Sequence, residues 1–443
     1  MFCDNILNEI KEIISNETVY LVGGYIRNYF LKDEISKDRD IVVLKNSYDF
    51  AQKIASKFNG TLIELDKENE IYRVVLPDKE NFFDVAVAYK NDIVHDYKRR
   101  DFTINSIFYN LNKDELFDPL NGIYDIKNRI LRTINLDNML DDPLRFLRLY
   151  RFLAQTGFNI DNELNDFVKR NFSKIESVAK ERINYEIINM FEGKFIVEAL
   201  LKMYEDETLE QLFPFVKEIK RIPPNSHHHL DLIHHSIETV NQIRTNNPIL
   251  KIAAFYHDIG KPATWTIEPV GRHRFIGHDL KGAEIVKKEL ENLKFSNKQI
   301  NYISKMVKYH IYPASLIQCE DCGNKKAFAR FIRKLGDDTP DIIELARADR
   351  LSAQGNAVTK EMTDITLNHL NNLLNYYNDV KKRGIDTKVL LDGKEIMELL
   401  NLKPSKKVGI IIEQLKEAQI SGEVTSKEEA IEFVKQLNTK GNV

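Results

Sequence analysis

The chain has 443 residues, 43% of them hydrophobic, which is enough to bury more than one core and suggests about three domains. Its 64 basic and 67 acidic residues leave a net charge of −3, so any attraction to nucleic acid has to come from local basic patches. With three cysteines and no run of about 18 apolar residues, the sequence excludes a disulfide framework and a membrane span, and it suits a reducing cytoplasm.

The first third of the chain mixes predicted strands with predicted helices. The N-terminus carries charges within an apolar pattern, which predicts an amphipathic helix instead of a signal peptide. Five short runs rich in Val and Ile, bounded by Gly, Asn, Asp or Pro, predict strands. These runs are TVYLVGG, RDIVVL, GTLIEL, IYRVVL and FFDVAVA.

From about residue 140 onward, apolar residues recur every three or four positions, which predicts helices. The prolines of RIPPNSHHH predict a boundary near residue 222, and KKRGID separates a last helical piece. The fold class expected is α+β, with a head, a helical neck, a second helical domain and a helical tail at residues 1–135, 136–222, 223–376 and 377–443.

A glycine pair and three aspartates make the head a candidate catalytic site. Gly23 and Gly24 lie between a predicted strand and a predicted helix, where free N–H groups favour a phosphate, although an ordinary tight turn has the same pattern. Asp38 and Asp40 are two apart on a predicted strand, so their carboxylates share a face and suit Mg²⁺. Asp84, on another predicted strand, could hold a second metal or accept the proton of an attacking hydroxyl.

Two later motifs suit nucleotide binding. In RRDFTIN, Arg99 and Arg100 can neutralise a triphosphate, and a solvated surface pair is the alternative. In DDPLRFLR, Asp142 and Arg145 are three apart on a predicted helix and hence on one face, where a local ion pair worth about 0.2–0.5 kcal/mol is the alternative. Cytosine and adenine both present an amino donor beside a ring-nitrogen acceptor, whereas guanine and uracil present a carbonyl beside an N–H. A carboxylate next to a guanidinium therefore admits C and A and rejects G and U.

Five motifs between residues 19 and 190 resemble the bacterial class II tRNA nucleotidyltransferase and poly(A) polymerase family, part of the DNA polymerase beta superfamily. They are LVGGYIRNYFL…DRDIVVL, RRDFTINSIFYN, DPLNGIYDI, DDPLRFLRLYRF and ERINYEI. The resemblance implies a head with a mixed sheet in which Asp38 and Asp40 hold the catalytic Mg²⁺, with Asp84 as the third catalytic residue. It implies transfer of C and A from CTP and ATP to the 3′ end of tRNA.

The resemblance also assigns roles to individual residues. Asp101 accepts a hydrogen bond from the ribose 2′-OH, and Arg100 helps to hold the nucleotide. Arg148 and Arg151 are expected to reach the phosphates or the RNA, and Arg182 in ERINYEI either packs the helix or acts in the site. The implied nucleotide-binding set is Gly23, Gly24, Arg27, Arg100, Asp101, Asp142, Arg145, Arg148 and Arg151.

The length of residues 85–98 bears on the product. In family members that build the whole CCA end, this stretch is longer and forms a flexible loop, and the shorter form resembles enzymes that add only CC. Complete CCA addition and CC addition alone therefore both stay open, and addition of A alone and polyadenylation are the further alternatives.

Nine of the eleven histidines lie between residues 227 and 310. His235, the pair His257–Asp258 and Asp349 resemble the HD metal-dependent phosphohydrolase motif, with His278 and His310 as further candidate ligands. Imidazole and carboxylate ligands suit a divalent Mn, Ni or Fe ion or Mg²⁺, and a bound water could attack a phosphoester. A helical domain that serves only as an RNA-binding scaffold is the alternative, as is phosphohydrolysis as the main activity of the chain.

Three smaller expectations complete the prediction. Cys319 and Cys322 form one CxxC pair, which is typical either of a metal or redox site or of a turn. His227, His228, His229 and His234 are expected to be loop or surface residues. The tail resembles the family's C-terminal region, where Lys406 and Lys407 could meet tRNA phosphates. The expected protein is a cytoplasmic monomer or homodimer without a membrane partner.

Overall fold

The chain, described by a computed structural model, divides into two compact units, Met1–Gln211 and Leu212–Val443. The described residues are 4–32, 37–223, 231–269, 271–318, 325–353, 355, 358–384 and 389–439. Cys319, Cys322, His227, His228 and His229 lie outside them. None of the helices in the described part of the chain is long and apolar enough to cross a membrane.

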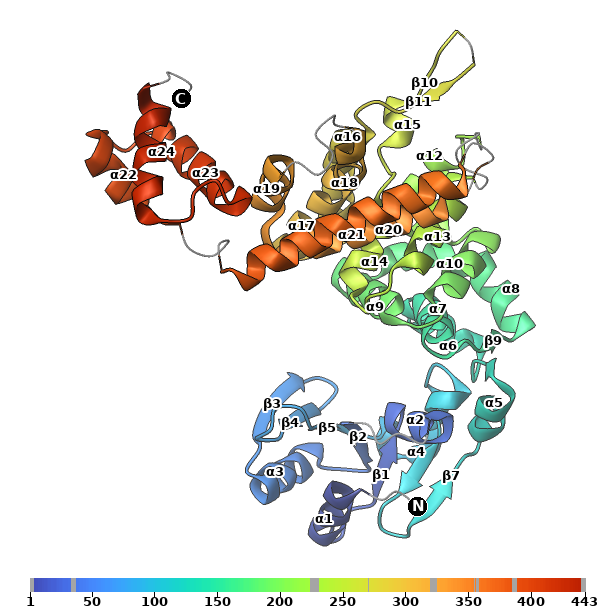
Figure 1. Cartoon of the computed structure of the whole chain (residues 1–443). Helices are drawn as coiled ribbons and strands as arrows, with labels where there is room; N and C mark the ends of the chain where they lie inside the picture. Colours follow the sequence, from blue (N-terminus) through green and yellow to red (C-terminus); the bar gives the residue numbers. More distant parts are fainter. Residues whose placement is uncertain are drawn as a thin grey trace. The chain divides into compact units, whose positions relative to one another are not determined.

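The first unit contains a seven-stranded mixed sheet in the order β3-β4-β5-β2-β1-β6-β7 (Figure 1). Its strands are β1 Val19–Val22, β2 Asp38–Val43, β3 Thr61–Asp66, β4 Ile71–Val75, β5 Phe82–Val87, β6 Phe108–Asn110 and β7 Glu115–Phe117. Only β2 and β5 run parallel to each other, and the remaining neighbours are antiparallel. This confirms the mixed sheet.

Five helices are interspersed with these strands along the chain. They are α1 Asn5–Ile13, α2 Gly24–Lys32, α3 Ser47–Phe58, α4 Ile93–Lys98 and α5 Gly122–Asn128. The five predicted strands correspond to β1 to β5, and the N-terminal amphipathic helix is α1. Strands β6 and β7 were not predicted, because runs of three residues are too short to show an alternating pattern.

The rest of the first unit is helical, apart from a short parallel pair formed by β8 Ile130–Leu131 and β9 Asn159–Ile160. Its helices are α6 Leu136–Asp141, α7 Leu144–Thr156, α8 Asn162–Asn171, α9 Lys180–Glu192, α10 Ile196–Glu205 and α11 Leu209–Leu212. The last residue of α11 is the first residue of the second unit. Helix α7 begins after Pro143, ends at Gly157 and packs against α9 and α10. Because most of its side chains are buried, α7 holds its arginines in fixed positions.

In its described residues the second unit is helical except for one hairpin of β10 Thr266–Ile267 and β11 His273–Arg274, which the sequence did not predict. The first of its helices are α12 Phe215–Ile219, α13 Leu232–Gln242, α14 Pro248–Tyr256, α15 Lys261–Thr264, α16 His278–Asn292, α17 Asn297–Tyr309 and α18 Tyr312–Ser315. They are followed by α19 Lys325–Leu335, α20 Thr339–Ser352, the long α21 Lys360–Lys382, α22 Gly393–Leu400, α23 Lys406–Ser421 and α24 Lys427–Thr439 (Figure 1).

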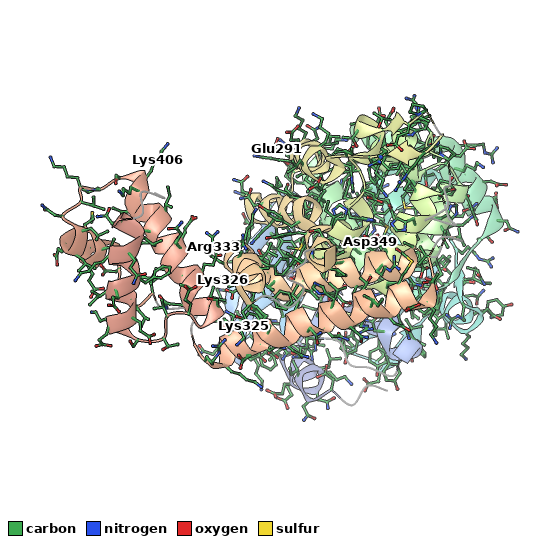
Figure 2. All side chains as sticks on the ribbon, turned by 45° about the horizontal axis from the view of Figure 1, so that its top comes forward. Glu291, Lys325, Lys326, Arg333, Asp349 and Lys406 are labelled. Carbon is green, nitrogen blue, oxygen red and sulfur yellow. The ribbon has the colours of Figure 1, made fainter. Side chains whose placement is uncertain are left out.

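Ion pairs near the surface connect α19 to α23 and to the residues just after it. Lys326 and Arg333 of α19 (Figure 2) lie 2.8 Å from Glu423 and Glu413, respectively. Such pairs contribute about 0–1 kcal/mol each. The tail also has its own small core, which includes Ile396, Ile411 and Leu415.

Candidate active site

Three carboxylates converge on one face of the central strands. The parallel register of β2 and β5 places Asp40 beside Asp84, and Asp38 lies two residues earlier on the same face. Each of the three offers an oxygen within 4.8 Å of the others. Burial, together with Asp38 and Asp84, raises the pKa of Asp40 to about 7, and burial and Asp84 raise the pKa of Asp38. Because clustered anions repel one another, this site favours a cation, and carboxylate oxygens suit a divalent one.

The pKa of Asp40 predicts how pH acts on the metal-free protein. A carboxyl whose pKa is raised from 3.8 to about 7 on folding stabilises the fold below pH 4, and this contribution is lost as pH rises through 7. As pH rises from 5 to 8, we expect the ionisation of Asp40 to lower the free energy of unfolding by about 2–3 kcal/mol in total. Thermal unfolding of wild type and Asp40→Asn in a chelator would measure this difference, which Mg²⁺ should reduce. Equal pH dependence in both proteins would contradict the prediction.

Arg73 is a member of this cluster that the sequence reasoning missed. It lies on β4 directly opposite Asp84, and its Nε and Nη2 donate to the two carboxylate oxygens at 2.7 Å each. This bidentate pair orients Asp84 and partly balances the negative charge of the cluster. The signal was present in IYRVVL, where one arginine interrupts an apolar strand, but its partner depends on the strand order.

Gly23 makes the close approach to Asp40 possible. It has a φ of +70°, which disfavours residues with a side chain, and a Cβ at this position would lie 2.8 Å from Asp40 Oδ2. Gly24 then begins α2. The turn therefore brings the N-terminus of a helix next to the carboxylates, as a phosphate-binding role requires.

A cavity of about 500 Å³ beside these carboxylates is lined by arginines. The predicted residues on its wall are Gly23, Gly24, Arg27, Asp38, Asp40, Arg100, Asp101, Asp142, Arg145, Arg148 and Arg151. Arg27 donates to Asn105 Oδ1 at 2.7 Å, and Arg100 donates to Asp96 Oδ2 through its Nε at 3.0 Å. All of the predicted nucleotide-binding residues thus lie around one cavity, with Asp84 next to it in the carboxylate cluster.

Buried carboxylates hold the arginines of α7. Asp101 accepts from Arg148 Nε at 2.9 Å, from Asn105 at 3.0 Å and from the Phe102 backbone at 2.7 Å. Although burial alone would raise it, the charge of Arg148 and these hydrogen bonds hold the pKa of Asp101 well below its usual range. Glu186 of α9, which the sequence reasoning missed, lies 3.2 Å from Arg151 Nε and 3.6 Å from Arg148 Nη1. It was missed because its partners lie on another helix.

The prediction that Asp142 and Arg145 share one helical face is wrong. Asp142 has extended backbone angles and lies between α6 and α7, because the residue before a proline disfavours the helical region. Its carboxylate accepts from Arg182 Nη2 at 2.8 Å. Arg145, in the first turn of α7, donates to the backbone carbonyls of Asn138 and Arg99 at 2.7 and 2.8 Å. Both side chains nevertheless line the cavity, and Arg182 lines it with them.

A second group of candidate metal ligands lies in the second unit. His235 Nε2 is 3.2 Å from His257 Nε2 and 3.2 Å from Asp349 Oδ1, and His257 Nε2 is 3.2 Å from Asp258 Oδ2. These residues come from α13, from the end of α14 and from α20, where Figure 2 labels Asp349. The four predicted HD residues therefore lie together.

His278 and His310 extend this cluster on the other side of Asp258. Their Nε2 atoms are 3.2 Å apart and lie 3.5 and 3.8 Å from Asp258 Oδ1. Asp258 thus presents one oxygen to each pair of histidines. Burial opposes its charged form, yet His257 and the Lys261 ammonium, 2.5 Å from Oδ2, hold the pKa of Asp258 well below its usual range.

The ring orientations fit a metal centre. The Nδ1 atoms of His257, His278 and His310 lie 2.7–2.8 Å from the backbone carbonyls of Ala254, Phe275 and Val307. A donated Nδ1–H at these positions leaves an Nε2 lone pair on each ring, which is the form that binds a metal. Two such Nε2 atoms, those of His278 and His310, lie 3.2 Å apart, an arrangement that is favourable when a cation lies between them.

Comparison with known proteins gives matches in both units. Residues 19–132 match the poly A polymerase head domain, residues 157–220 the probable RNA and SrmB-binding site of polymerase A, and residues 230–354 the HD domain. An A-adding tRNA nucleotidyltransferase of Deinococcus radiodurans is 29% identical over 426 residues, 94% of each chain. A CC-adding tRNA nucleotidyltransferase of Thermus thermophilus is 28% identical and covers 93% of this chain and 92% of its own.

The fold is also that of a solved relative. The Bacillus stearothermophilus CCA-adding enzyme in complex with CTP superimposes with a TM-score of 0.63 at 18% identity, over 98% of this chain and 96% of that one. The chain carries a poly A polymerase head domain and an HD domain. Over nearly its whole length it is similar to curated tRNA nucleotidyltransferases.

Proposed function

We propose that the protein adds C and A to the 3′ end of tRNA from CTP and ATP without a template. The observation that carries this proposal is the cluster of Asp38, Asp40 and Asp84 beside an arginine-lined cavity. The 3′ hydroxyl oxygen bonds to the α-phosphorus, the bond from that phosphorus to the bridging oxygen breaks, and pyrophosphate leaves.

Each part of the site has a role in this reaction. A divalent ion held by Asp38 and Asp40, for which we propose Mg²⁺, neutralises charge on the phosphates when it is bound. Asp84, oriented by Arg73, accepts the hydroxyl proton or helps to hold a second ion. The arginines of the cavity hold the triphosphate by charge-assisted hydrogen bonds.

We propose that Asp142 and Arg145 select the base. The carboxylate of Asp142 is held by Arg182, and Arg145 is held by two carbonyls. A guanidinium has five N–H donors, so Arg145 has further donors for a ring nitrogen, while Asp142 accepts from the amino group. The pair fits C and A and opposes G and U.

Replacing Arg145 by Ala tests this assignment. We expect Arg145→Ala to lose about 1–3 kcal/mol of discrimination, a factor of roughly 5 to 150, because the ring-nitrogen acceptor would lose its donor. Single-nucleotide incorporation with CTP, ATP, GTP and UTP would measure it, with Arg170→Ala, an exposed arginine of α8, as the control. An unchanged preference for CTP and ATP would refute the assignment.

Addition of CC alone is the second candidate product. The Thermus relative, which matches nearly the whole chain, is a CC-adding enzyme, and residues 85–98 form the end of β5, a short 3-10 turn and α4. The purified protein should be offered tRNAs that lack CCA, CA or A, with both nucleotides. Ends complete in CCA on the tRNA that lacks all of CCA would support the main proposal, whereas ends that stop at CC would support the second candidate. Extension of only the tRNA that lacks A would contradict both.

The HD domain supports a further activity, metal-dependent phosphoester hydrolysis. The observation behind it is the six-residue cluster around Asp258. We propose that these residues would hold a divalent Mn, Ni or Fe ion, which would supply an activated water. The water oxygen would bond to phosphorus while the ester bond breaks and the alcohol leaves protonated. Asp258→Asn should reduce the rate of this hydrolysis by about a thousandfold and leave the rate of nucleotide addition unchanged. Retained hydrolysis in Asp258→Asn would contradict the role of the cluster.

A further inference from the structure

A cavity of about 460 Å³ adjoins the HD metal cluster and has a different character from the cavity of the head. Two of the candidate metal ligands, His310 and Asp349, form part of its wall. Most of the remaining wall is apolar and comes from α18, α20, α21 and the residues around them. The apolar side chains are Ile311, Ala314, Ile317, Ala346, Ala353, Val358, Met362 and Ile365.

Several of these apolar side chains are not covered by the described part of the chain. Ile311, Met362 and Ile365 are 38%, 45% and 52% exposed. Exposed apolar side chains that surround a cavity of this size are typical of a small-molecule pocket, in which a few polar groups set the orientation of the ligand.

Arg350 supplies such a polar group. It follows Asp349 on α20 and lines the cavity, and its Nε and Nη2 are buried without a hydrogen-bond partner among the described residues. Nε and Nη2 form one side of the planar fork with which arginine binds two oxygens of a phosphate. Buried donors without acceptors are costly, so they indicate an acceptor that arrives with a ligand.

From this arrangement we infer that the cavity is the substrate pocket of the HD centre, and that it selects phosphomonoesters of an apolar, ring-sized organic group. The phosphate lies between the metal cluster and Arg350, and the organic group packs against Ile311, Met362 and Ile365. Thr366 donates its hydroxyl to the Met362 carbonyl, which leaves this side chain of the wall without a donor for a polar edge of the ligand. The pocket therefore recognises the apolar surface of the organic group, and it discriminates against small polyol phosphates. This inference rests on the phosphohydrolase activity proposed for the HD domain.

The first experiment compares two substrates on the full-length protein loaded with Mn²⁺. Because the pocket would bury about 100 Å² of the apolar surface of the ring, we expect phenyl phosphate to exceed glycerol phosphate by roughly fiftyfold in kcat/KM. Ile365→Asn, at an exposed position of α21, should reduce this preference to about fivefold or less by making the wall polar. The matched control is Ile410→Asn, at the exposed isoleucine of α23 that is not part of the cavity and should keep the preference.

The second experiment measures binding by calorimetry, which does not need turnover. Phenylphosphonate should bind the Mn²⁺-loaded protein about tenfold or more tightly than methylphosphonate does. Ile365→Asn should abolish the difference, and Arg350→Gln should weaken both ligands, because it removes the fork that both phosphonates share.

The two proposals fail in different ways. If no phosphoester is hydrolysed with any metal while phenylphosphonate binding still depends on Ile365 and Arg350, the hydrolase proposal falls and the pocket stands. If phenyl phosphate and glycerol phosphate are hydrolysed equally well, and Ile365→Asn changes neither hydrolysis nor phosphonate binding, the pocket inference is overturned and the hydrolase stands.

Discussion

Asp40→Ala is expected to reduce nucleotide addition by about a thousandfold or more, since a metal ligand contributes several kcal/mol of transition-state stabilisation. Asp40 lies at the centre of the cluster, beside Asp84 across the parallel pair and next to the glycine turn. Its removal leaves Asp38 and Asp84 unable to enclose an ion. Incorporation of labelled CMP into tRNA that lacks CCA would measure the loss.

Two controls separate this effect from damage to the fold. Glu64→Ala removes an exposed carboxylate from β3 of the same sheet and should keep full activity. The HD activity of Asp40→Ala should be unchanged, because its residues lie in the second unit. The variant should also be at least as stable as wild type above pH 7 without metal, since it removes a repelling charge. Activity of Asp40→Ala within tenfold of wild type would disprove the metal site.

Gly23→Ala should have the second largest effect, a loss of about a hundredfold in nucleotide addition, which is what a displacement of about 1 Å can cost at a reacting centre. The backbone at Gly23 has a φ of +70°, and the new Cβ would approach Asp40 Oδ2 to 2.8 Å. Alanine therefore forces the carboxylate or the turn to move.

The neighbouring glycine is the matched control. A Cβ at Gly24 would meet only Arg27 Nη2, at 3.6 Å, and Gly24 begins α2 without a positive φ. Gly24→Ala should therefore lose less than about fivefold, consistent with ordinary van der Waals contact. The steady-state rate with CTP would separate the two variants. Equal losses in both would show that the approach of Gly23 to Asp40 is not important.

The order of motifs made much of the head predictable. Strand periodicity is local, so Asp38 and Asp40 could be placed on one face from their spacing alone. Helical periodicity likewise predicted the helical region that follows the head, and the five motifs indicated the family resemblance. The candidate metal ligands of the HD domain were recognised from the residues around them in the sequence, although they come from several helices.

Other features depended on contacts between residues far apart in the chain. Arg73 meets Asp84 because β4 pairs with β5, and Glu186 meets Arg151 because α9 packs on α7. Asp142 was placed on a helix from its spacing, but Pro143 excludes it from α7 and Arg182 then binds it. The pocket beside Arg350 is likewise formed by side chains from separate helices.

The sequence by itself predicted β1 to β5, the helical body, the candidate ligands and the family resemblance, because hydrophobic period, turn residues and motif spacing are properties of neighbouring positions. Only the tertiary structure decided which charges meet. Strand order and helix packing bring together side chains that no local pattern connects. Burial then shifts their pKa values and leaves two Arg350 donors without an acceptor among the described residues.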